Sequence, residues 1–574
     1  MPDDFIRHTN TGEEKDAVKE VRTNYEAAFL AKEDVGVQSD LADLDDYWAG
    51  RQVSATDEDD PASNVNIILP VIEGQISDLI DEPLDIYAEG WEPSDIPYSD
   101  DVQTMLRWIW YRNKMLPRID RFERQRLKFG TGIWHTYYDP VSDMPLFRPV
   151  NPANFFPDPK VSAADLLEEA DFIIVAIPRS LAYLRRKYGD IAKAVKPETN
   201  PSYNPQMFTG ENADSVSAVL NSKALVITQY AKDDKGQLYV KTVAGDVVLR
   251  DSRKERDKPF YRHNRQPFSV VPCYPREGIL WGMGDVELLK PIQDAVNDFD
   301  DQIRMNARLM GNLQVVVGIA SGINPFKWTN KPGLKIPARD PSAWQAVQPQ
   351  SIPAYIAERR YALLRESEMV SGRSDVVEGR KPSGVEAAAA IAALQQAGMR
   401  RVRHKRIFLQ DGLSDAMEQA LEIVKEEWTE ERAFRILGKT PDYKWFRASD
   451  LTSTPLLGQD GNPIMSEGQM ATKDAKFDIR VTMGTGLMMN SYMAYQTALA
   501  MSQSGLITRD EARLIAGKAL GWPIMGPPQG EWAPMKGVTP TAGGTDMTQA
   551  GNALQGLPPQ IMEQVMALAQ GAGQ

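Results

Sequence analysis

Apolar residues recur every three or four positions in long stretches of this chain, which is the pattern of helices with one buried face. We expect helices at 13–33, 40–47, 66–80, 100–129, 181–188, 285–311, 353–370, 385 to about 431, and 491–520. Pro117 is expected to kink or split the helix at 100–129, and Gly130 to end it. Pro291 is expected to mark the true first turn of its helix. The longest helix carries an apolar stripe made of Leu409, Leu413, Met417, Ala420, Val424 and Trp428.

Shorter apolar runs bounded by Gly, Pro, Asn or Asp predict strands. These runs are 85–88, 133–138, 146–150, 172–177, 225–230, 238–243, 247–249, 314–318 and 477–482. Turns at Asp139-Pro140 and at 233–236 predict two β-hairpins, and the polar stretch 196–222 is expected to be a loop. The fold class is therefore α+β and mainly helical.

The centre of the chain has a distinctive order of elements. The helix at 285–311 could reach roughly 40 Å. A proline-rich insert at 312–352 and a second helix follow it, so the two helices are expected to form a hairpin with a small β tip. A polar loop at 371–384, with charges of both signs, then precedes the longest helix.

Composition narrows the possible functions. The 574 residues carry a net charge of −14, and residues 1–60 account for −11 of it, with 17 Asp/Glu against 6 Lys/Arg. A protein that grips DNA by neutralising phosphates should be basic, so tight static DNA binding is disfavoured. One cysteine and four separated histidines disfavour disulfides and His/Cys metal catalysis. We also expect no membrane span and no secretory signal, because apolar runs are short and the N-terminus is acidic.

Catalytic motifs are incomplete in this sequence. Gly438-Lys439-Thr440 lacks the first glycine of a phosphate loop, since Ala433 stands there. The pairs Gly282/Gly284 and Gly484/Gly486 lack a third glycine, and we interpret both as turns. Acidic pairs such as Asp300-Asp301 suit a metal-dependent nuclease, which is the alternative function, but solvated surface is the favoured interpretation.

Basic clusters and isolated reactive side chains also have two interpretations each. The run 400–406 could contact phosphate, but we favour a solvated helix segment or intersubunit salt bridges. The same preference applies to the basic residues spaced along 118–128. His135 and Cys273 stand in apolar surroundings, where core packing is the favoured role.

The order of elements and several short stretches resemble the portal protein of tailed double-stranded DNA bacteriophages. The similar stretches are Tyr47-Trp48, Asn64-Val65-Asn66 before IILPVIEGQISDLI, FGTGIWHTYYDP at 129–140, Val150-Asn151-Pro152 with 156–159, and GMGDVELLKPIQDAVNDFDDQIRMN at 282–306. The resemblance covers nearly the whole chain.

The resemblance implies a ring, usually of twelve copies, at one capsid vertex of the virion, assembled in the host cytoplasm. Double-stranded DNA would enter and leave through its central channel. The implied partners are the terminase large subunit, the head–tail adaptor, the major capsid protein and, where one exists, a scaffold protein. The resemblance implies no catalytic or metal site, no cofactor and no membrane contact.

The resemblance also implies a domain map. Its parts are a wing at 1–284 and 385–490, a stem at 285–311 and 353–371, a clip at 312–352, a tunnel loop at 372–384, and a crown with a flexible tail at 491–574. The tunnel-loop residues implied to face DNA are Arg373, Ser374, Asp375, Glu378, Arg380 and Lys381. The clip residues implied to contact terminase or adaptor are Phe326, Lys327, Trp328, Lys331 and Lys335. An acidic lumen would repel phosphate and let the duplex slide.

Overall fold

The structure is a computed structural model that divides the chain into two compact units, residues 1–484 and 485–574. It describes residues 12–51, 64–80, 84–197, 223–255, 259–311, 314–318, 344–347, 353–372, 400–436, 442–456, 463–466 and 469–483, all within the first unit. The loop expected at 196–222, the segment 385–399 of the long helix, the helices expected at 491–520 and the Gly438-Lys439-Thr440 triplet lie wholly or mostly outside these ranges.

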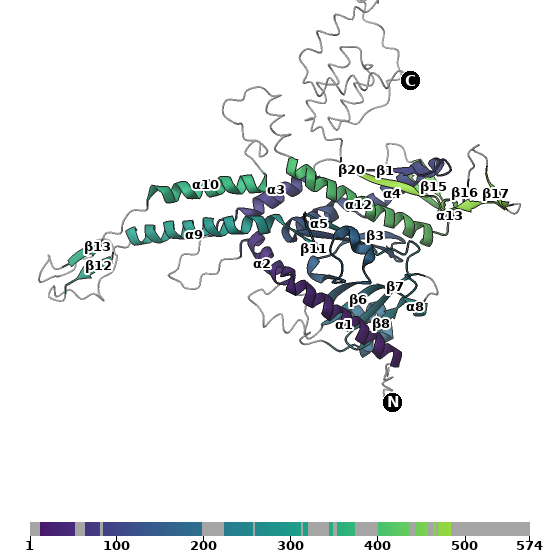
Figure 1. Ribbon diagram of the computed structural model, residues 1–574, viewed down its shortest axis with the longest axis horizontal. Helices are drawn as coiled ribbons and strands as arrows, with labels where there is room; N and C mark the ends of the chain where they lie inside the picture. Colours follow the sequence, from purple (N-terminus) through teal and green to yellow (C-terminus); the bar gives the residue numbers. More distant parts are fainter. Residues whose placement is uncertain are drawn as a thin grey trace, which may run out of the picture. The chain divides into compact units, whose positions relative to one another are not determined.

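Five α-helices, one strand and one 3-10 turn form the N-terminal part of the unit (Figure 1). They are α1 (Gly12–Asp34), α2 (Val37–Ala49), α3 (Ile68–Ile80), β1 (Leu84–Gly90), the 3-10 turn η1 (Ile96–Tyr98), α4 (Ser99–Arg112) and α5 (Met115–Phe129). Asn66 caps α3, because its Oδ1 accepts from the amides of Ile68 (3.1 Å) and Leu69 (3.0 Å). Gly130, at φ 81°, ends α5 as expected.

The stretch 100–129 is two helices, and the break does not lie where proline predicts it. The chain turns at Asn113 and Lys114, and Lys114 adopts the left-handed conformation with φ 50°. The Asn113 amide donates to the carbonyls of Ile109 and Pro145, both at 3.0 Å, so a tertiary contact fixes the turn. Pro117 falls within the first turn of α5, where its missing N–H costs no helical hydrogen bond.

Two antiparallel sheets follow. One has the order β4-β5-β6-β7-β8 and the other β3-β2-β9. Their strands are β2 (Thr131–Asp139), β3 (Met144–Pro149), β4 (Phe155–Pro157), β5 (Phe172–Ser180), β6 (Lys223–Lys232), β7 (Leu238–Ala244), β8 (Val247–Asp251) and β9 (Phe268–Pro272). Strands β10 (Tyr274–Arg276) and β11 (Ile279–Met283) form a separate antiparallel pair. Both predicted hairpins, β2–β3 and β6–β7, are confirmed. Short helical segments between the strands are η2 (Pro152–Asn154), η3 (Ala164–Glu169), α6 (Leu181–Tyr188), η4 (Gly189–Ala194) and α8 (Ser252–Glu255).

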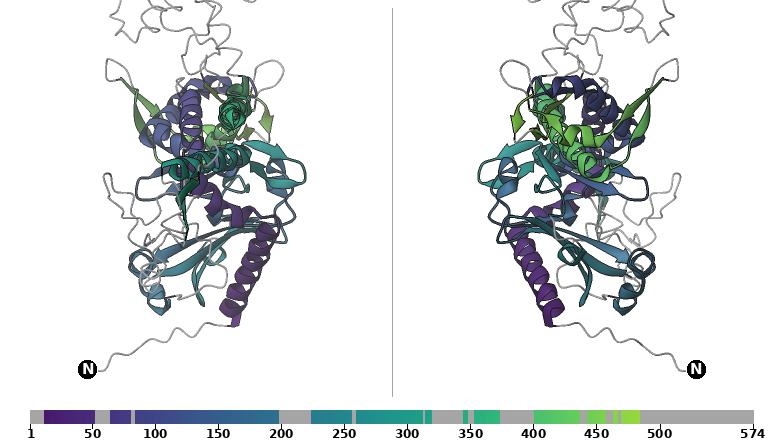
Figure 2. Two further views of the ribbon diagram at one scale, coloured as in Figure 1. Left: turned by 90° about the vertical axis from the view of Figure 1, so that its left-hand side faces the viewer. Right: turned by 90° about the vertical axis from the view of Figure 1, so that its right-hand side faces the viewer.

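Helix α1 covers the five-stranded sheet (Figure 2). Its buried face carries the residues whose helical spacing the sequence shows, among them Val21, Tyr25 and Phe29. The Tyr25 and Phe29 rings meet the ring of Phe156 from β4 at 5.0 and 5.7 Å between centroids. Burial of such aromatic side chains holds the acidic helix on the sheet even though its outer face is charged.

The largest core lies around α12 (Arg400–Glu427). All six residues of the predicted stripe, from Leu409 to Trp428, are buried against α4, α5 and β2. The helix ends four residues before the expected end at 431. The remaining elements are β14 (Arg432–Ile436), β15 (Asp442–Phe446), α13 (Ala448–Thr452), β16 (Thr454–Pro455), β17 (Met465–Ser466), β18 (Gln469–Met470), β19 (Thr472–Lys473) and β20 (Phe477–Met483). Strand β20 pairs with β1 in antiparallel register, from Leu84–Met483 to Gly90–Phe477.

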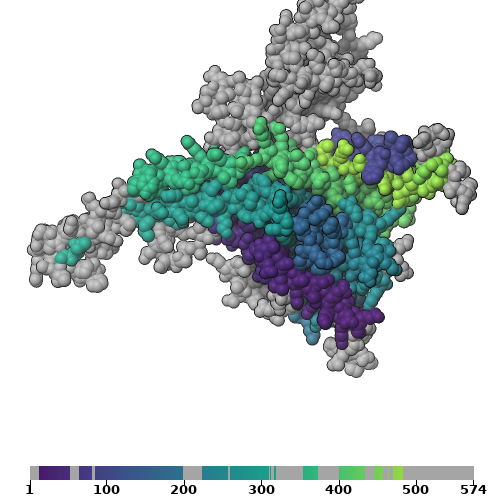
Figure 3. Space-filling model, viewed as in Figure 1, coloured from purple at the N-terminus to yellow at the C-terminus, as the bar shows by residue number. Residues whose placement is uncertain are grey.

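Two long helices, α9 (Asp285–Gly311) and α10 (Ala354–Ser371), lie side by side as the predicted hairpin (Figures 1 and 3). Pro291 stands inside α9, not at its start, so the expected role of Pro291 is wrong: Asp285 already begins the helix after Gly284. At the far end of the hairpin, β12 (Gln314–Val317) pairs with β13 (Trp344–Val347). No helix within the described ranges has both the length and the apolar character of a membrane span.

Candidate functional site

The two predicted functional segments, the clip and the tunnel loop, are next to the helices of the hairpin in the sequence. The tunnel-loop residues Arg373, Ser374, Asp375, Glu378, Arg380 and Lys381 lie outside the described residues, as do the clip residues Phe326, Lys327, Trp328, Lys331 and Lys335. The structure describes what holds these loops: α9 and α10, the β12–β13 pair, and a polar cluster at the base of the hairpin. This polar base therefore links the described helices to the point from which the predicted tunnel loop begins.

An ion pair between Lys405 of α12 and Asp285 of α9 forms the centre of the base cluster. Each residue is only 1% exposed. The Lys405 ammonium also donates to Oε1 of Gln75 on α3 at 2.7 Å, and it lies 4.9 Å from the Tyr274 ring centroid. Burial alone would lower the pKa of Lys405, but the charge and hydrogen bond of the Asp285 carboxylate act in the opposite direction, and the pKa is raised. Lys405 therefore stays charged and ties α3, α9 and α12 together.

A second buried ion pair lies in the same cluster. Arg126 and Glu123 are both fully buried on α5, with 2.7 Å between Nη2 and Oε2. Arg126 also donates to the carbonyl of Lys405 at 3.2 Å, which joins the two pairs. Burial raises the pKa of Glu123, while Arg126 and Lys405 act in the opposite direction. The two cations and two carboxylates balance, so the buried cluster carries no net charge.

The cluster also holds the end of α10, directly before the predicted tunnel loop. Gln75 Nε2 donates to the carbonyl of Ser371 at 3.3 Å. Arg401 of α12 donates to the carbonyls of Met369, at 2.9 Å, and of Val370. Carbonyls in the last turn of a helix need partners from outside the helical ladder, and a cation there is also favoured by the helix dipole. The chain thus enters the loop from a fixed point.

Three glycines allow the close backbone packing at the start of α9. A Cβ on Gly282 would lie 2.5 Å from the carbonyl oxygen of Gly130, and one on Gly284 would lie 2.8 Å from the carbonyl oxygen of Leu127. Gly282 belongs to β11 rather than to a turn, which corrects the interpretation from the sequence. The Gly-x-Gly pattern therefore serves close contact between β11 and the end of α5.

Along the hairpin, Arg360 of α10 reaches Asp300 of α9. The two side chains form two hydrogen bonds, one of them 3.0 Å between Nη2 and Oδ2, and both are largely buried. Asp300 belongs to one of the acidic pairs considered for a nuclease, and its carboxylate instead joins α9 to α10. Large side chains remain exposed on α10, including Tyr355 at 65% and Met369 at 74%.

The two basic runs of the sequence are partly internal. In the run 400–406, Lys405 and Arg406 are buried, so the interpretation as a solvated segment is wrong for these two residues, whereas Arg401 is exposed and binds the end of α10. The burial of Lys405 was open to prediction, because it falls between Val402 and Leu409 on the buried face. On α5, the buried Lys128 pairs with Asp45 and the buried Arg126 with Glu123, so the solvated interpretation is wrong for these two residues, whereas Arg121 is exposed as expected.

The two isolated reactive side chains pack as expected. Cys273 is fully buried, and burial raises the pKa of its thiol to about 12. The imidazole of His135 lies 3.1 Å from the Tyr230 hydroxyl and 4.7 Å from the Phe268 ring centroid, and burial lowers its pKa to about 3. Within the described ranges, no group of three or more His, Cys, Asp or Glu side chains is placed to hold a metal ion.

Comparison with known proteins places this fold among phage portal proteins. The family described as phage SU10 portal protein matches residues 120–462, more than half of the chain, from α5 through the hairpin and α12 to the short strands after it. The chain belongs to this family. Portal proteins of this kind are generally not enzymes and are components of the virion capsid.

The chain is also similar to a solved structure from the neck of an empty GTA particle. The two share 9% sequence identity, and the match covers 85% of this chain and 94% of the other with a TM-score of 0.38. No match was found among curated proteins.

Proposed function

We propose that copies of this chain form a closed ring at one capsid vertex, and that double-stranded DNA is packaged and ejected through its central channel. The observation that carries the proposal is the family match, because it includes the hairpin of α9 and α10 together with its polar base. A two-helix hairpin that leaves Tyr355, Tyr361 and Met369 exposed is suited to packing against further copies.

The domain map follows from the same proposal. Helices α9 and α10, within 285–311 and 353–371, form the stem, and the segment 312–352 forms the clip. The segment 372–384 is the tunnel loop, which starts where Arg401 and Gln75 hold α10. Residues 1–284 and 385–490 form the wing, and 491–574 form the crown with its tail.

The charges favour a conduit over a DNA clamp. The chain is acidic overall, and a basic lumen would release counterions and retain the duplex. In the proposal, weak and transient contact with DNA comes from the mixed charges of the tunnel loop, Arg373, Arg380 and Lys381 against Asp375 and Glu378. The terminase large subunit and the head–tail adaptor dock on the clip at residues 326–335, and the major capsid protein surrounds the wing.

Negative-stain microscopy combined with native mass spectrometry tests the ring. We expect closed particles of about twelve subunits with an axial hole. A chain that stays monomeric or dimeric across salt and protein concentrations would refute the proposal. Addition of divalent metal and plasmid DNA to the same sample should give no cleavage, and metal-dependent cleavage would favour the nuclease alternative instead.

The DNA contact has its own test. Arg380→Gln combined with Lys381→Gln should change DNA packaging or retention while rings still assemble. The matched control is Lys15→Gln combined with Lys235→Gln, which removes the same charge from exposed positions elsewhere. If the tunnel-loop variant abolished assembly alone, or packaged DNA like the control, the contact role would be wrong.

A further inference from the structure

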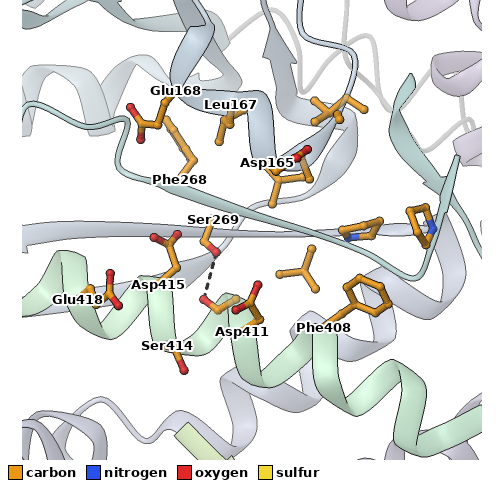
Figure 4. A pocket seen from close by; sticks show the side chains of 18 of the residues that line it. Asp165, Leu167, Glu168, Phe268, Ser269, Phe408, Asp411, Ser414, Asp415 and Glu418 are labelled. Carbon is orange, nitrogen blue, oxygen red and sulfur yellow. Dashed lines mark hydrogen bonds between the residues drawn. The ribbon is translucent and has the colours of Figure 1, made fainter. Parts of the chain in front are cut away.

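An acidic groove opens between η3, β9 and α12, with a volume of about 860 Å³ (Figure 4). Six carboxylates line it, from Asp165, Glu168, Asp411, Asp415, Glu418 and Asp478, against three guanidinium groups. Asp411, Asp415 and Glu418 share one side of α12, at the spacing i, i+4 and i+7, and Asp165 and Glu168 lie across β9 from them.

The groove has fewer cations than carboxylates. The guanidinium of Arg265 forms ion pairs with three carboxylates. Its nitrogens lie 2.7 Å from Asp415, 3.5 Å from Glu168 and 3.7 Å from Glu418. The Asp411 side chain has no ion pair or hydrogen bond with any described residue. Like charges at i, i+4 on one helix destabilise each other, so a further cation in the groove would be favourable.

A buried polar atom beside the groove also lacks a partner. Gln419 is 2% exposed, and its Nε2 donates to Asp415 at 3.1 Å, but its Oε1 has no partner among the described residues. Gln419 lines an adjoining hollow of about 460 Å³ that shares Arg265 and Glu418 with the groove. A buried amide oxygen without a donor is costly, and an N–H donor would satisfy it. Both observations point to a guanidinium or ammonium group as the ligand.

The chain carries one matching surface. Arg185, Arg186 and Lys187, at the C-terminal end of α6, are the only three consecutive Lys or Arg residues in the sequence, and all three are exposed. Arg185 and Arg186 form no ion pair with any described residue. Unlike the buried Lys405 and Arg406, these cations are therefore available to another molecule.

We propose that the acidic groove of one copy receives the Arg185–Lys187 run of the neighbouring copy in the ring. This inference rests on the proposed function. Copies that close into a ring by rotation meet through two different surfaces, which must complement each other. The groove and the α6 run have opposite charge, and guanidinium groups bind carboxylates in a bidentate geometry that also fixes orientation.

Charge reversal on each side tests the contact. Variant A carries Asp411→Lys and Glu418→Lys, and variant B carries Arg185→Glu and Arg186→Glu. Alone, each variant presents like charges at every contact, so we expect the subunit concentration needed for half-assembly to rise about tenfold or more. Mixed one to one, A and B can alternate around the ring with opposite charges at every contact, and assembly should return. A chain with all four substitutions should assemble as well.

Native mass spectrometry gives the readout, and near-ultraviolet circular dichroism confirms that each variant is folded. The control Asp234→Lys with Glu26→Lys makes the same charge change as variant A at exposed positions outside the groove and should leave assembly unchanged. Folded variants A and B that assemble like the control would overturn the inference, and so would a mixture that fails to assemble. Absence of rings from the unaltered chain would instead refute the proposed function itself, and the inference with it.

Discussion

The polar cluster at the base of the hairpin makes a sharp prediction about single and double substitutions. Asp285→Asn would leave the buried Lys405 ammonium without its carboxylate, and Lys405→Met would leave the buried carboxylate without its cation. The cluster, which also contains Arg126 and Glu123, is neutral in the unaltered protein. Either substitution leaves it with a net charge of one. Breaking one side of a buried pair costs about 3–5 kcal/mol.

The double variant should cost much less than the sum of the two single variants. With both charges absent, no uncompensated ion remains in the cluster, and a neutral replacement of a buried pair is often tolerated. If the two single substitutions acted additively, the double variant would lose about 6–10 kcal/mol of stability. A loss no larger than that of one single variant is easily distinguished from this sum.

Hydrogen exchange of the amides in α9 and α10, followed by mass spectrometry, measures this locally. A loss of about 3–5 kcal/mol corresponds to opening that is more frequent by about two to four powers of ten. Lys160→Met is the matched control, because its ion pair with Asp171 is exposed and screened by solvent and should contribute little to stability. Additive single effects, or a Lys405→Met variant that exchanges like the control, would refute the argument from buried charge.

Three further predictions concern packing, pH and thiol chemistry. Gly282→Ala should destabilise the protein by about 1–3 kcal/mol in urea unfolding, because its Cβ would meet the Gly130 carbonyl, whereas Gly311→Ala, with open space around it, should change stability by less than about 0.5 kcal/mol. Burial lowers the pKa of His135 to about 3. At any pH below the ordinary histidine pKa of about 6.5, unfolding therefore exposes an imidazole that takes up a proton, which favours the unfolded state. The contribution of neutral His135 to the free energy of unfolding should be complete above about pH 6.5 and lower by about 2 kcal/mol at pH 5. His135→Gln should flatten this part of the pH dependence, and an unchanged slope would contradict it. Burial raises the pKa of the Cys273 thiol to about 12, so iodoacetamide should modify the native protein at pH 8 at least about a hundredfold more slowly than the unfolded chain, and comparable rates would contradict the burial.

Local patterns were sufficient to predict elements whose boundaries depend on nearby residues. Helix α9 spans Asp285–Gly311, the full range that its apolar spacing predicts, although Pro291 does not mark its first turn. The stripe on α12 is buried because helical periodicity places those residues on one face. The break between α4 and α5 could not be found in this way, since Asn113 is fixed by the carbonyl of Pro145 on β3.

Contacts between distant parts of the sequence could not be predicted from local patterns. Strand β1 finds its partner in β20, nearly 400 residues away, and no local signal specifies that register. The same is true of Gln75, which bridges Lys405 and the end of α10. The candidate loops themselves, at 326–335 and 373–381, remain predictions from the resemblance to portal proteins.

The internal use of the basic run at 400–406 bears directly on the proposed function. Taken alone, such a run indicates a surface for nucleic acid, because each free cation that meets a phosphate releases a counterion. A cation that is already neutralised or buried contributes little to that release, and the buried Lys405 and Arg406 are bound to Asp285 and to the carbonyl of Asp78. The three arginines earlier in the run are exposed, and one of them, Arg401, holds the end of α10. The two buried cations therefore strengthen the base of the hairpin and add little to DNA affinity. Together with the net charge of −14, this use of basic residues favours a passage through which DNA can move over a surface that retains it.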